Sequence, residues 1–572
     1  MTTLDVSTPQ QVPQEPAVER KQWTALVVLL FAVFMDMLDG NLVSVAIPSI
    51  RADLDASYAA VQWVSAGYVL AFALLLVTGG RLGDIYGRKR VFMLGVAGFT
   101  AASALCGFAT APEMLVGARL FQGAMAGLMV PQVLSIIHVT FPASKRPAVF
   151  AIYGVVGGIA ATVAPLVGGV LVDLDLFGLG WRPIFLINVP IGLVGAYLGL
   201  RSITESKAAK ALRLDLPGVA LASLALLLLL YPLTQGRELG WPAWGNVLMA
   251  LSAVVLAVFV VYERRREQRG LSPLVPLALF KARSFSAGQV LQLTLFLFTG
   301  AFFLAWYLFM QLGLGWSALH AGLTGLSFCV GAFITSALSV TLLAPKFGRV
   351  VLQIGALVLA AGLGAFLWVV TANGAGTSSW LMVGPLLLVG LGFGLIAPPI
   401  ALFALSDVPH EDAGAASGLI NTMAQLGLAL GIALVSLVFF NPLGSHASSS
   451  AQDIAPKVRQ ELSAAGVPAD QLDGIVTSFR SCATEQVSGK DAKGLPASCV
   501  PAPAVRDNPA AMKALAGLGR ETTANAFAGA LRPTLFTTIG LMLATLLVTF
   551  GLPKRAPEAQ PDQADQPDQA GV

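Results

Sequence analysis

The chain has 572 residues, of which 56% are hydrophobic and only 12% are charged. Soluble domains carry about 25% charged residues, so this composition indicates a polytopic membrane protein and excludes an ordinary soluble domain. The formal net charge is +4, and the basic residues stand in short stretches between apolar runs. We therefore expect the lipid bilayer as the main surrounding of this chain, and no nucleic-acid partner.

The apolar runs are long and continuous. A membrane-spanning helix needs about 20 mostly apolar residues, whereas a membrane β-barrel is built from short segments of alternating hydrophobicity. The sequence therefore predicts an all-α polytopic membrane protein. We expect fourteen transmembrane helices, at residues 23–48, 60–80, 91–109, 113–136, 148–172, 183–201, 214–233, 246–262, 285–310, 319–343, 350–371, 380–404, 414–440 and 532–552.

Basic residues are concentrated in alternate connections between these spans. One side collects stretches such as RLGDIYGRKR (81–90), whereas the short loops on the other side contain only Arg51, Arg182 and Arg237. Positively charged short loops stay in the cytoplasm. Both termini are therefore predicted to be cytoplasmic, and the long segment 441–531 is predicted to lie outside.

A weak internal repeat divides the membrane part. The stretch RLGDIYGRKR returns as LLAPKFGR (342–349), so that Gly87-Arg88 matches Gly348-Arg349. Two related six-helix bundles form a transporter architecture, with the substrate site near the middle of the membrane. The expected division is a disordered tail at 1–22, a first bundle at 23–203, two inserted helices with a cytoplasmic linker at 204–283, a second bundle at 284–552 that includes the outer segment 441–531, and a disordered tail at 553–572.

Four cysteines are present. Cys106 and Cys329 fall in predicted spans, where free cysteines are common core residues. Cys482 and Cys499 both fall in the predicted outer segment, and the compartment outside the cytoplasm permits disulfides. We expect a Cys482–Cys499 disulfide; the alternative is a pair of unpaired surface thiols.

The stretch GGRLGDIYGRKR (79–90) combines glycines, an acid and bases at a fixed spacing. It resembles the loop between the second and third helices of the major facilitator superfamily, G-x-L-x-D-x-x-G-R-K/R. The matching residues are Gly80, Leu82, Asp84, Gly87, Arg88 and Lys89. The resemblance implies a cytoplasmic latch, in which Asp84 and the basic residues hold the two bundles together in the outward-facing state.

Two further spans carry patterns of the same superfamily. RLFQG (119–123) resembles its R-x-x-Q-G pattern, which implies a role for Arg119 in proton coupling; the alternative is that Arg119 snorkels to the outer surface. GIAATVAPLVGG (158–169) resembles the antiporter motif G-x-x-x-G-P-x-x-G-G, which is typical of exporters. Pro165, Gly168 and Gly169 match this motif, and Ala164 replaces a glycine. The alternative there is an ordinary packing helix rich in small residues.

Two aspartates lie inside the first predicted span. Asp36 and Asp39 are three residues apart, so they share one helical face, and an ionised aspartate at a helix centre costs about 3 kcal/mol. LDGNLVSVAIPSI (38–50) resembles the first-helix motif of the fourteen-helix drug:proton antiporters, with Asp39 at the acidic position. We expect the pair to exchange a proton as one coupled unit. The alternative is that one aspartate caps a kink or pairs structurally with Arg119.

Several other polar and aromatic residues of the spans are candidates for a substrate cavity. The polar candidates are Asn41, Gln62, Tyr68, Gln122, Gln292, Gln311, Asn421 and Gln425. The candidates for stacking on a flat substrate are Trp63, Trp306 and Tyr307. Each of these residues taken alone is more commonly a packing residue.

These patterns together favour a proton-coupled antiporter that exports amphipathic or cationic drugs across the bacterial inner membrane by alternating access. The alternative is a dedicated exporter of one endogenous metabolite, such as an antibiotic or an amino acid derivative. The four histidines are scattered and show no metal-ligand spacing, so we expect no enzyme activity, metal or cofactor. We expect a monomer whose partners are lipid, protons and a small-molecule substrate. The segment 441–531 either caps the outer vestibule or docks an extracytoplasmic partner.

Overall fold

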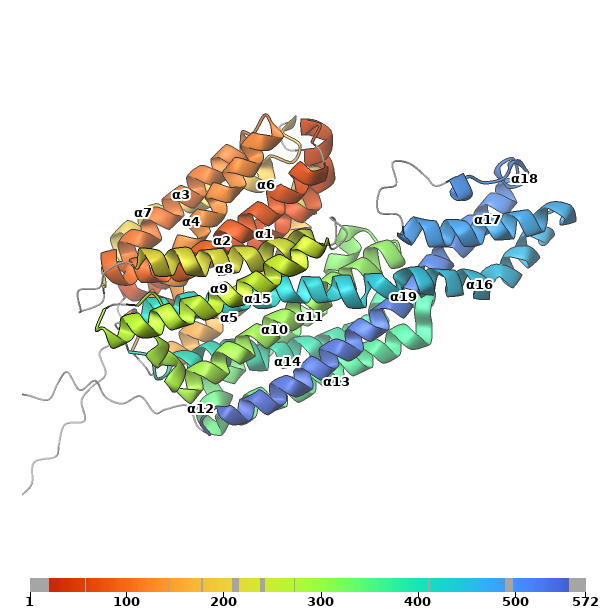
Figure 1. Ribbon diagram of the computed structural model, residues 1–572. Coiled ribbons are helices and arrows are strands. Elements are labelled where there is room, and N and C mark those ends of the chain that lie inside the picture. Colours follow the sequence, from red (N-terminus) through yellow and green to blue (C-terminus); the bar gives the residue numbers. More distant parts are fainter. Residues whose placement is uncertain are drawn as a thin grey trace, which may run out of the picture.

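A computed structural model describes residues 20–56, 58–142, 145–175, 178–207, 215–236, 242–271, 273–409, 412–488 and 497–554. Every regular element in these ranges is a helix. The two predicted tails fall almost wholly outside the described residues. The helices form two bundles, an inserted hairpin and an extension at one end (Figure 1).

The first bundle is built from seven helices that follow one another along the chain. They are α1 (Arg20–Leu54), α2 (Tyr58–Tyr86), α3 (Arg88–Gly107), α4 (Pro112–Thr140), α5 (Arg146–Asp173), α6 (Pro183–Leu186) and α7 (Asn188–Ser202). Prolines occupy the first turn of α4 and α6, where the missing amide hydrogen removes no helical hydrogen bond. The buried core contains Phe92, Phe99 and Met129 among other large apolar side chains.

The second bundle repeats this plan with more irregular helix ends. Its elements are η2 (Leu277–Lys281), α10 (Arg283–Leu308), η3 (Phe309–Gly313), α11 (Ala318–Leu338), η4 (Ser339–Leu343), α12 (Ala344–Phe347), α13 (Val350–Asn373), η5 (Gly374–Gly376), α14 (Ser379–Leu405), α15 (Ala413–Val438), α19 (Pro509–Val548) and η8 (Thr549–Gly551). Its core is rich in aromatic rings, among which Phe302 stacks on Trp306 at a centroid distance of 6.0 Å.

The internal repeat is visible in the backbone. Gly87 directly precedes α3 with φ of 109°, and Gly348 precedes the α13 region with φ of 59°. Residues with a side chain rarely adopt a positive φ, so glycine is the residue that allows both sharp turns. The next residues differ in their partners, because Arg88 binds Asp84, whereas Arg349 donates to the carbonyls of Phe550 and Leu552.

The first membrane helix begins on the same side of the molecule on which the last membrane helix ends. We call this side the latch end; it carries the connections α2–α3 and α14–α15 and is the predicted cytoplasmic side. Near the start of α1, Gln22 donates to the carbonyl of Thr140 at the latch end of α4. The end of α19 is bound by Arg349, which precedes α13 on that side. The start of α1 and the end of α19 therefore both lie at the latch end.

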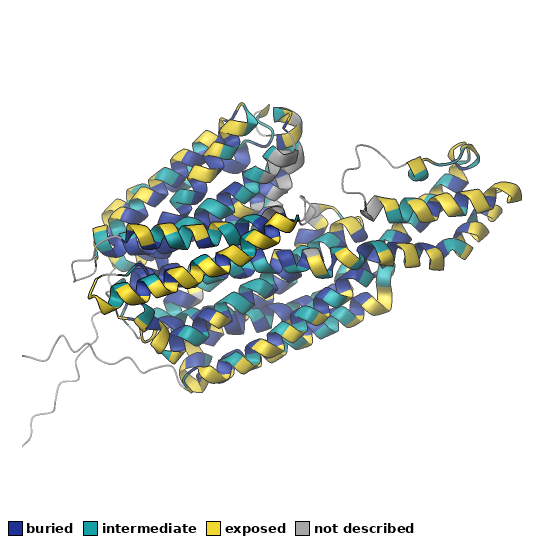
Figure 2. Cartoon of the chain, in the orientation of Figure 1, coloured by how far each residue is buried: buried dark blue, intermediate teal, exposed yellow. Residues whose placement is uncertain are grey.

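Thirteen helices in the described residues are long and apolar enough to cross a membrane. The helix α5 is not among these thirteen, and the predicted count of fourteen is reached only if α5 is also a span. It has 28 residues and coincides with the expected span 148–172. That count and the cytoplasmic position of the termini stay predictions. The outward faces of the bundles and much of α9 are exposed (Figure 2). Many of these exposed residues are large and apolar, as expected for contact with lipid.

The two inserted helices, α8 (Leu216–Gln235) and α9 (Ala243–Gln268), form a hairpin that contacts both bundles. Leu230 of α8 packs with Ala73 of α2 and Ala429 of α15. At its latch end, the buried Asp215 caps α8 by accepting a hydrogen bond from the Gly218 amide at 3.1 Å. The hairpin therefore covers one seam between the two bundles.

The segment 441–531 forms a helical outer domain. It contains α16 (Phe440–Ala464), α17 (Ala469–Ser488), η7 (Ala497–Cys499), α18 (Pro503–Arg506) and the first half of α19. Buried side chains such as Val458 and Leu518 give it a core of its own. It extends away from the second bundle (Figure 1).

The last membrane helix starts earlier than the sequence predicts. The expected span covers 532–552, but α19 runs without interruption from Pro509, where the Asn508 side chain caps it by accepting from Ala510 and Ala511. Its alanine-rich first half accommodates Gly517 and Gly519, and Pro533 lies further along inside the same helix. The outer domain is thus tied to the second bundle by continuous helix.

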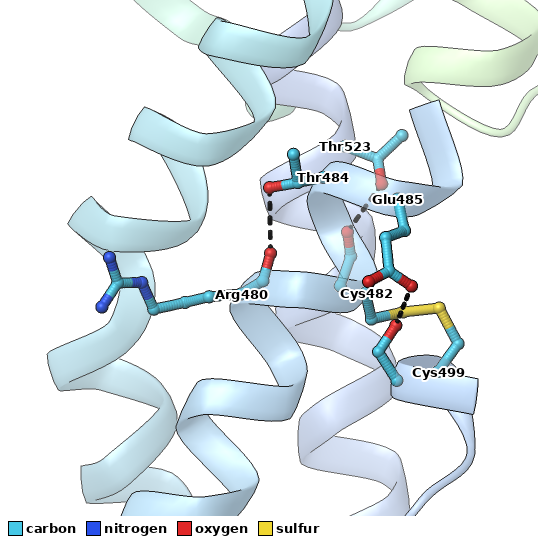
Figure 3. Close-up of a disulfide and its surroundings, with 8 residues drawn as sticks. Arg480, Cys482, Thr484, Glu485, Cys499 and Thr523 are labelled. Carbon is cyan, nitrogen blue, oxygen red and sulfur yellow. Dashed lines mark hydrogen bonds between the residues drawn. A yellow bond between two sulfur atoms is a disulfide. The ribbon is translucent and has the colours of Figure 1, made fainter. Parts of the chain in front are cut away.

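A Cys482–Cys499 disulfide joins α17 to η7, which confirms the predicted pairing (Figure 3). Ser498 donates a hydrogen bond of 2.7 Å to Glu485 beside it. Of the remaining cysteines, Cys106 is buried and its thiol donates to Gln122 at 3.6 Å, and Cys329 is half-buried.

The disulfide gives a direct test of the topology. On intact cells, a membrane-impermeant maleimide should label the protein only after treatment with an impermeant phosphine reductant. The Cys482→Ser, Cys499→Ser double variant should stay unlabelled in both conditions and should lose about 3 kcal/mol of outer-domain stability by the chain-entropy relation. Labelling of the unreduced wild type would show that the disulfide is absent from the exposed side.

Candidate functional site

The two aspartates of the first span lie one turn apart on α1 and are both buried. The side chain of Asp36 is 4% exposed and that of Asp39 is 1% exposed. Within the described residues, their hydrogen-bond and ion-pair partners come from α2, α4 and α7, which all belong to the first bundle. The environments of the two carboxylates differ.

Asp39 is fully occupied by donors. Arg119 of α4 forms an ion pair with its Oδ2 atom. Its Oδ1 atom accepts hydrogen bonds from Gln122 at 2.9 Å and from Asn188 at 3.0 Å. A buried carboxylate is tolerated when an opposite charge and hydrogen bonds satisfy it, as Arg119, Gln122 and Asn188 do here.

Arg119 is held inside the bundle. It is 1% exposed, its Nε donates to the Val64 carbonyl at 2.9 Å, and its Nη1 donates to Gln122 at 2.7 Å. The alternative that Arg119 snorkels to the surface is therefore wrong. Gln122 also donates to Ser103 at 2.7 Å, which extends the network to α3.

Asp36 has a simpler environment. In the described part of the chain, its one hydrogen-bond donor is the hydroxyl of Tyr68, which lies 2.5 Å from Oδ1. No ion pair within 4.0 Å involves Asp36 there. The Arg119 guanidinium lies over the Tyr68 ring, 4.2 Å from its centroid, so Tyr68 contacts both the Asp36 carboxyl and the Asp39–Arg119 pair.

The end of α2 is joined to the start of α15 by Asp84. Its two oxygens accept hydrogen bonds from the backbone amides of Gly414 and Ala415, each at 3.1 Å. Arg88 donates to the same carboxylate at 2.7 Å. Asp84 therefore caps a helix of the second bundle, where free amides and the helix dipole favour a negative charge.

Glycines allow the two helices to meet at this point. A Cβ atom on Gly80 would lie 2.9 Å from the carbonyl carbon of Gly414 and closer still to its oxygen. Close backbone contact of this kind needs residues without side chains. Gly80 is thus required where α2 crosses α15.

Two further contacts join the bundles at the latch end. Arg81, which is 2% exposed, lies 3.4 Å from Asp412 and 3.9 Å from Asp84. Ser135 of α4 donates to the carbonyl of Ala413 at 3.3 Å.

Gly87 and Lys89 have partners within the first bundle. Lys89 Nζ donates to the Leu200 carbonyl at 2.8 Å, and the Lys89 amide donates to Glu205 at 3.1 Å. A Cβ on Gly87 would lie 2.6 Å from the Glu205 carboxylate. These residues fix the loop against the end of α7, and Asp84, Arg88 and Arg81 make the contact region with α15.

The antiporter motif lies on α5. Gly168 and Ala164 are buried, and Ala164 packs in a cluster with Leu38 and Val43 of α1. The side chains of Pro165 and Gly169 lie outside the described residues. Gly154, nearer the latch end of α5, lies close to Pro398 of α14, so this helix contacts both its own bundle and the second one.

Of the candidate cavity residues, Tyr68 and Gln122 join the carboxylate network described above. Trp63 instead packs on Tyr231 of the inserted α8, at a centroid distance of 5.9 Å. The side chains of Asn41 and Gln62 lie outside the described residues.

In the described part of the chain, the candidates from the second bundle make no hydrogen bond or ion pair with the carboxylates of α1. Asn421 donates to the carbonyl of Ser417 within its own helix. Trp306 is buried against Tyr307, with ring centroids 4.9 Å apart. Gln292 and Gln425 are half-buried, and Gln311 is exposed in η3.

Several residues of the site were not singled out in the sequence. Asn188 and Ser103 complete the Asp39 network, and Arg81, Ser135 and Asp412 join the bundles. A polar residue inside an apolar run is a signal that Asn188, Ser103 and Ser135 share, and Arg81 begins the stretch RLGDIYGRKR. The proximity of Asn188 and Ser103 to Asp39 depends on packing between helices distant in sequence.

The comparisons with known proteins agree with this architecture. Residues 29–432 match the sequence profile described as Major Facilitator Superfamily. The chain is 42% identical over 543 residues to a protein named "Probable actinorhodin transporter" from Streptomyces coelicolor, covering 94% of this chain and 93% of the relative. It is 35% identical over 455 residues to the "Tetracenomycin C resistance and export protein" of Streptomyces glaucescens, covering 78% and 81%.

A crystal structure of a human organic anion transporter has the same fold at 17% identity, with a TM-score of 0.50 and coverage of 74% of this chain and 94% of that one. The match to the superfamily profile runs from α1 into α15 and leaves out α19, and the predicted resemblance is confirmed. The chain therefore belongs to the major facilitator superfamily, with relatives named as bacterial antibiotic transport, resistance and export proteins, and is a multi-pass protein of the inner membrane.

Proposed function

We propose that this protein exports an amphipathic compound in exchange for protons, and that Asp36 is the group that exchanges the proton. The observation that carries the proposal is the difference between the two carboxylates of α1. Asp39 is neutralised by Arg119, whereas Asp36 has the Tyr68 hydroxyl as its donor. A buried carboxylate without a counter-charge is costly, so it favours a proton or a cationic ligand.

The network suggests how proton binding is transmitted. Tyr68 donates to Asp36 and lies against the Arg119 guanidinium. Protonation of Asp36 removes a charge that attracts Arg119, so Arg119 binds Asp39 more strongly. Loss of the proton reverses this change and leaves a carboxylate for which a cationic substrate competes. Mutually exclusive occupancy of Asp36 is what an antiporter requires.

The contacts at the latch end support a role in alternating access. Asp84, Arg81 and Ser135 reach the first turn of α15 or the residue before it. Separation of the two bundles on this side must break these contacts and uncover the amides of α15. We infer that they stabilise the state that is closed to the cytoplasm, and that a substrate or proton bound between the bundles compensates for their loss.

The substrate is proposed to be a flat, mainly apolar compound. The second bundle contains a cluster of aromatic rings, in which Phe303 lies 5.0 Å from Phe328 and 5.7 Å from Trp306. Broad drug efflux and dedicated export of one antibiotic both fit this chemistry. Dedicated export is favoured by one observation, which is the 42% identity to a probable actinorhodin transporter over 94% of this chain. Because 94% of this chain is covered, the uncovered remainder is shorter than the outer domain, and the similarity extends into that domain.

Transport in proteoliposomes tests the roles of the carboxylates. With an imposed pH gradient, wild-type protein should move ethidium or an aromatic polyketide against its concentration gradient. Asp36→Asn should reduce the proton-driven flux at least about tenfold, because asparagine keeps a polar group beside Tyr68 but carries no exchangeable proton; a factor of ten corresponds to about 1.4 kcal/mol.

Asp53→Asn is the matched control, because Asp53 forms a partly exposed ion pair with Arg182 away from the network and should leave the flux unchanged. Asp39→Asn leaves Arg119 without its partner, which costs about 3–5 kcal/mol for a buried pair. The Asp39→Asn, Arg119→Gln double variant separates loss of folding from loss of transport. Wild-type flux in Asp36→Asn would reject the proposed role of Asp36.

The latch is tested by a single methyl group. Gly80→Ala places a Cβ against the Gly414 carbonyl and should keep α2 and α15 apart, whereas Gly117→Ala meets no atom within 4 Å. In inside-out vesicles, a cysteine introduced by Ser135→Cys should react with maleimide several-fold faster in the Gly80→Ala protein. Gly117→Ala should keep the original rate. Equal rates in all three proteins would contradict the latch.

A further inference from the structure

A small apolar groove lies on the lipid-facing surface of the second bundle, at the latch end. It has a volume of about 130 Å³ and is lined by Leu343, Phe347, Val351, Ile354 and Leu395. The lining exposes no polar surface. The groove lies far along the chain from the carboxylates of α1.

The local backbone produces this groove. After α11 the chain passes through the wide turns of η4 and the single turn of α12, and Gly348 then reverses its direction with φ of 59°. Gly355 lets α13 approach α14 closely at the next turn. The irregular end of α11 leaves space beside α13, and Val351 and Leu395, which are 2% and 7% exposed, form its buried floor.

The position of the groove relative to the membrane follows from the helices. One candidate span ends at Phe347 and the next begins at Val350. A helix rises 1.5 Å per residue, so Leu343 and Ile354 each lie about 6 Å inside the span. The groove therefore occupies the outermost part of the hydrocarbon layer, where acyl chains join the lipid headgroup.

A positive charge lies beside the groove. The Lys346 ammonium is 5.4 Å from the centroid of the Phe347 ring, which is itself part of the lining. Residues 339–358 contain no acidic residue, and Pro345 occupies the repeat position that corresponds to Asp84. Arg349 is used to bind the carbonyls at the end of α19. Lys346 is thus the basic group available to a ligand in the groove.

We propose that this groove binds one anionic phospholipid of the inner leaflet, with an acyl chain against Val351, Ile354 and Leu395 and the phosphate beside Lys346. An apolar groove that opens into hydrocarbon and carries a basic residue at the headgroup level matches both parts of such a lipid. Basic sites at the cytoplasmic face of membrane helices bind anionic headgroups in this way. The occupant is a phospholipid such as phosphatidylglycerol, and it binds independently of the transported substrate.

Native mass spectrometry of the purified full-length protein tests this proposal. Wild-type protein should retain phosphatidylglycerol in preference to phosphatidylcholine, and added inorganic phosphate should not displace it. Lys346→Gln should weaken phosphatidylglycerol binding about fivefold and leave phosphatidylcholine unchanged, because one basic residue near an anionic surface contributes that much. Ile354→Trp fills the groove and should weaken both lipids.

Two matched variants serve as controls. Lys281→Gln removes another exposed lysine of the same side, and Leu357→Trp adds the same bulk to a lipid-facing residue of α13 outside the groove. Both should bind phosphatidylglycerol like the wild type. Unchanged lipid selectivity in Lys346→Gln would overturn the headgroup assignment. Equal effects of Ile354→Trp and Leu357→Trp would show that only unspecific annular lipid is present.

Discussion

The ion pair between Asp39 and Arg119 is the interaction on which the first bundle depends. Two opposite charges are buried there at 1% exposure each, in a part of the protein that crosses the membrane. Such a pair is stable only when further groups satisfy its remaining donors and acceptors. Gln122, Asn188 and the Val64 carbonyl do this, and they bring four helices to one point. These groups bind Asp39, so the neighbouring Asp36 is the carboxyl of this pair that can accept a proton or a ligand.

The latch end uses the same principle between the bundles. Asp84 is buried, and its charge is satisfied by Arg88 from its own bundle and by two backbone amides of α15 from the other. The donors are backbone amides of α15, so the contact forms only when the end of α2 lies beside the first turn of α15. Gly80 allows this close approach because it has no side chain. The same α15 continues toward α16, and α19 runs from the outer domain into the membrane. A movement of the second bundle would therefore carry the outer domain with it.

Most of the architecture was predictable because it depends on local properties. Long apolar runs, basic loops and the glycine at positions 87 and 348 determine the helices, their alternation and the repeat. The Cys482–Cys499 pair was predictable because both cysteines share the outer segment. The extent of α19 was not, since hydropathy marks where a helix enters lipid and not where it begins. The partners of Asp39 were not predictable either, because Asn188 reaches it from a helix 149 residues away along the chain.

The central claim is that Asp36 exchanges the proton while Asp39 remains paired with Arg119. The most direct measurement is the number of protons released when the cation ethidium binds the purified protein in weakly buffered detergent solution. Wild-type protein should release about one proton per bound molecule, since binding and protonation compete for one carboxyl. Asp36→Asn should release none, while Asp53→Asn should behave like the wild type. Release of a full proton by Asp36→Asn would contradict the account and move the exchange to Asp39.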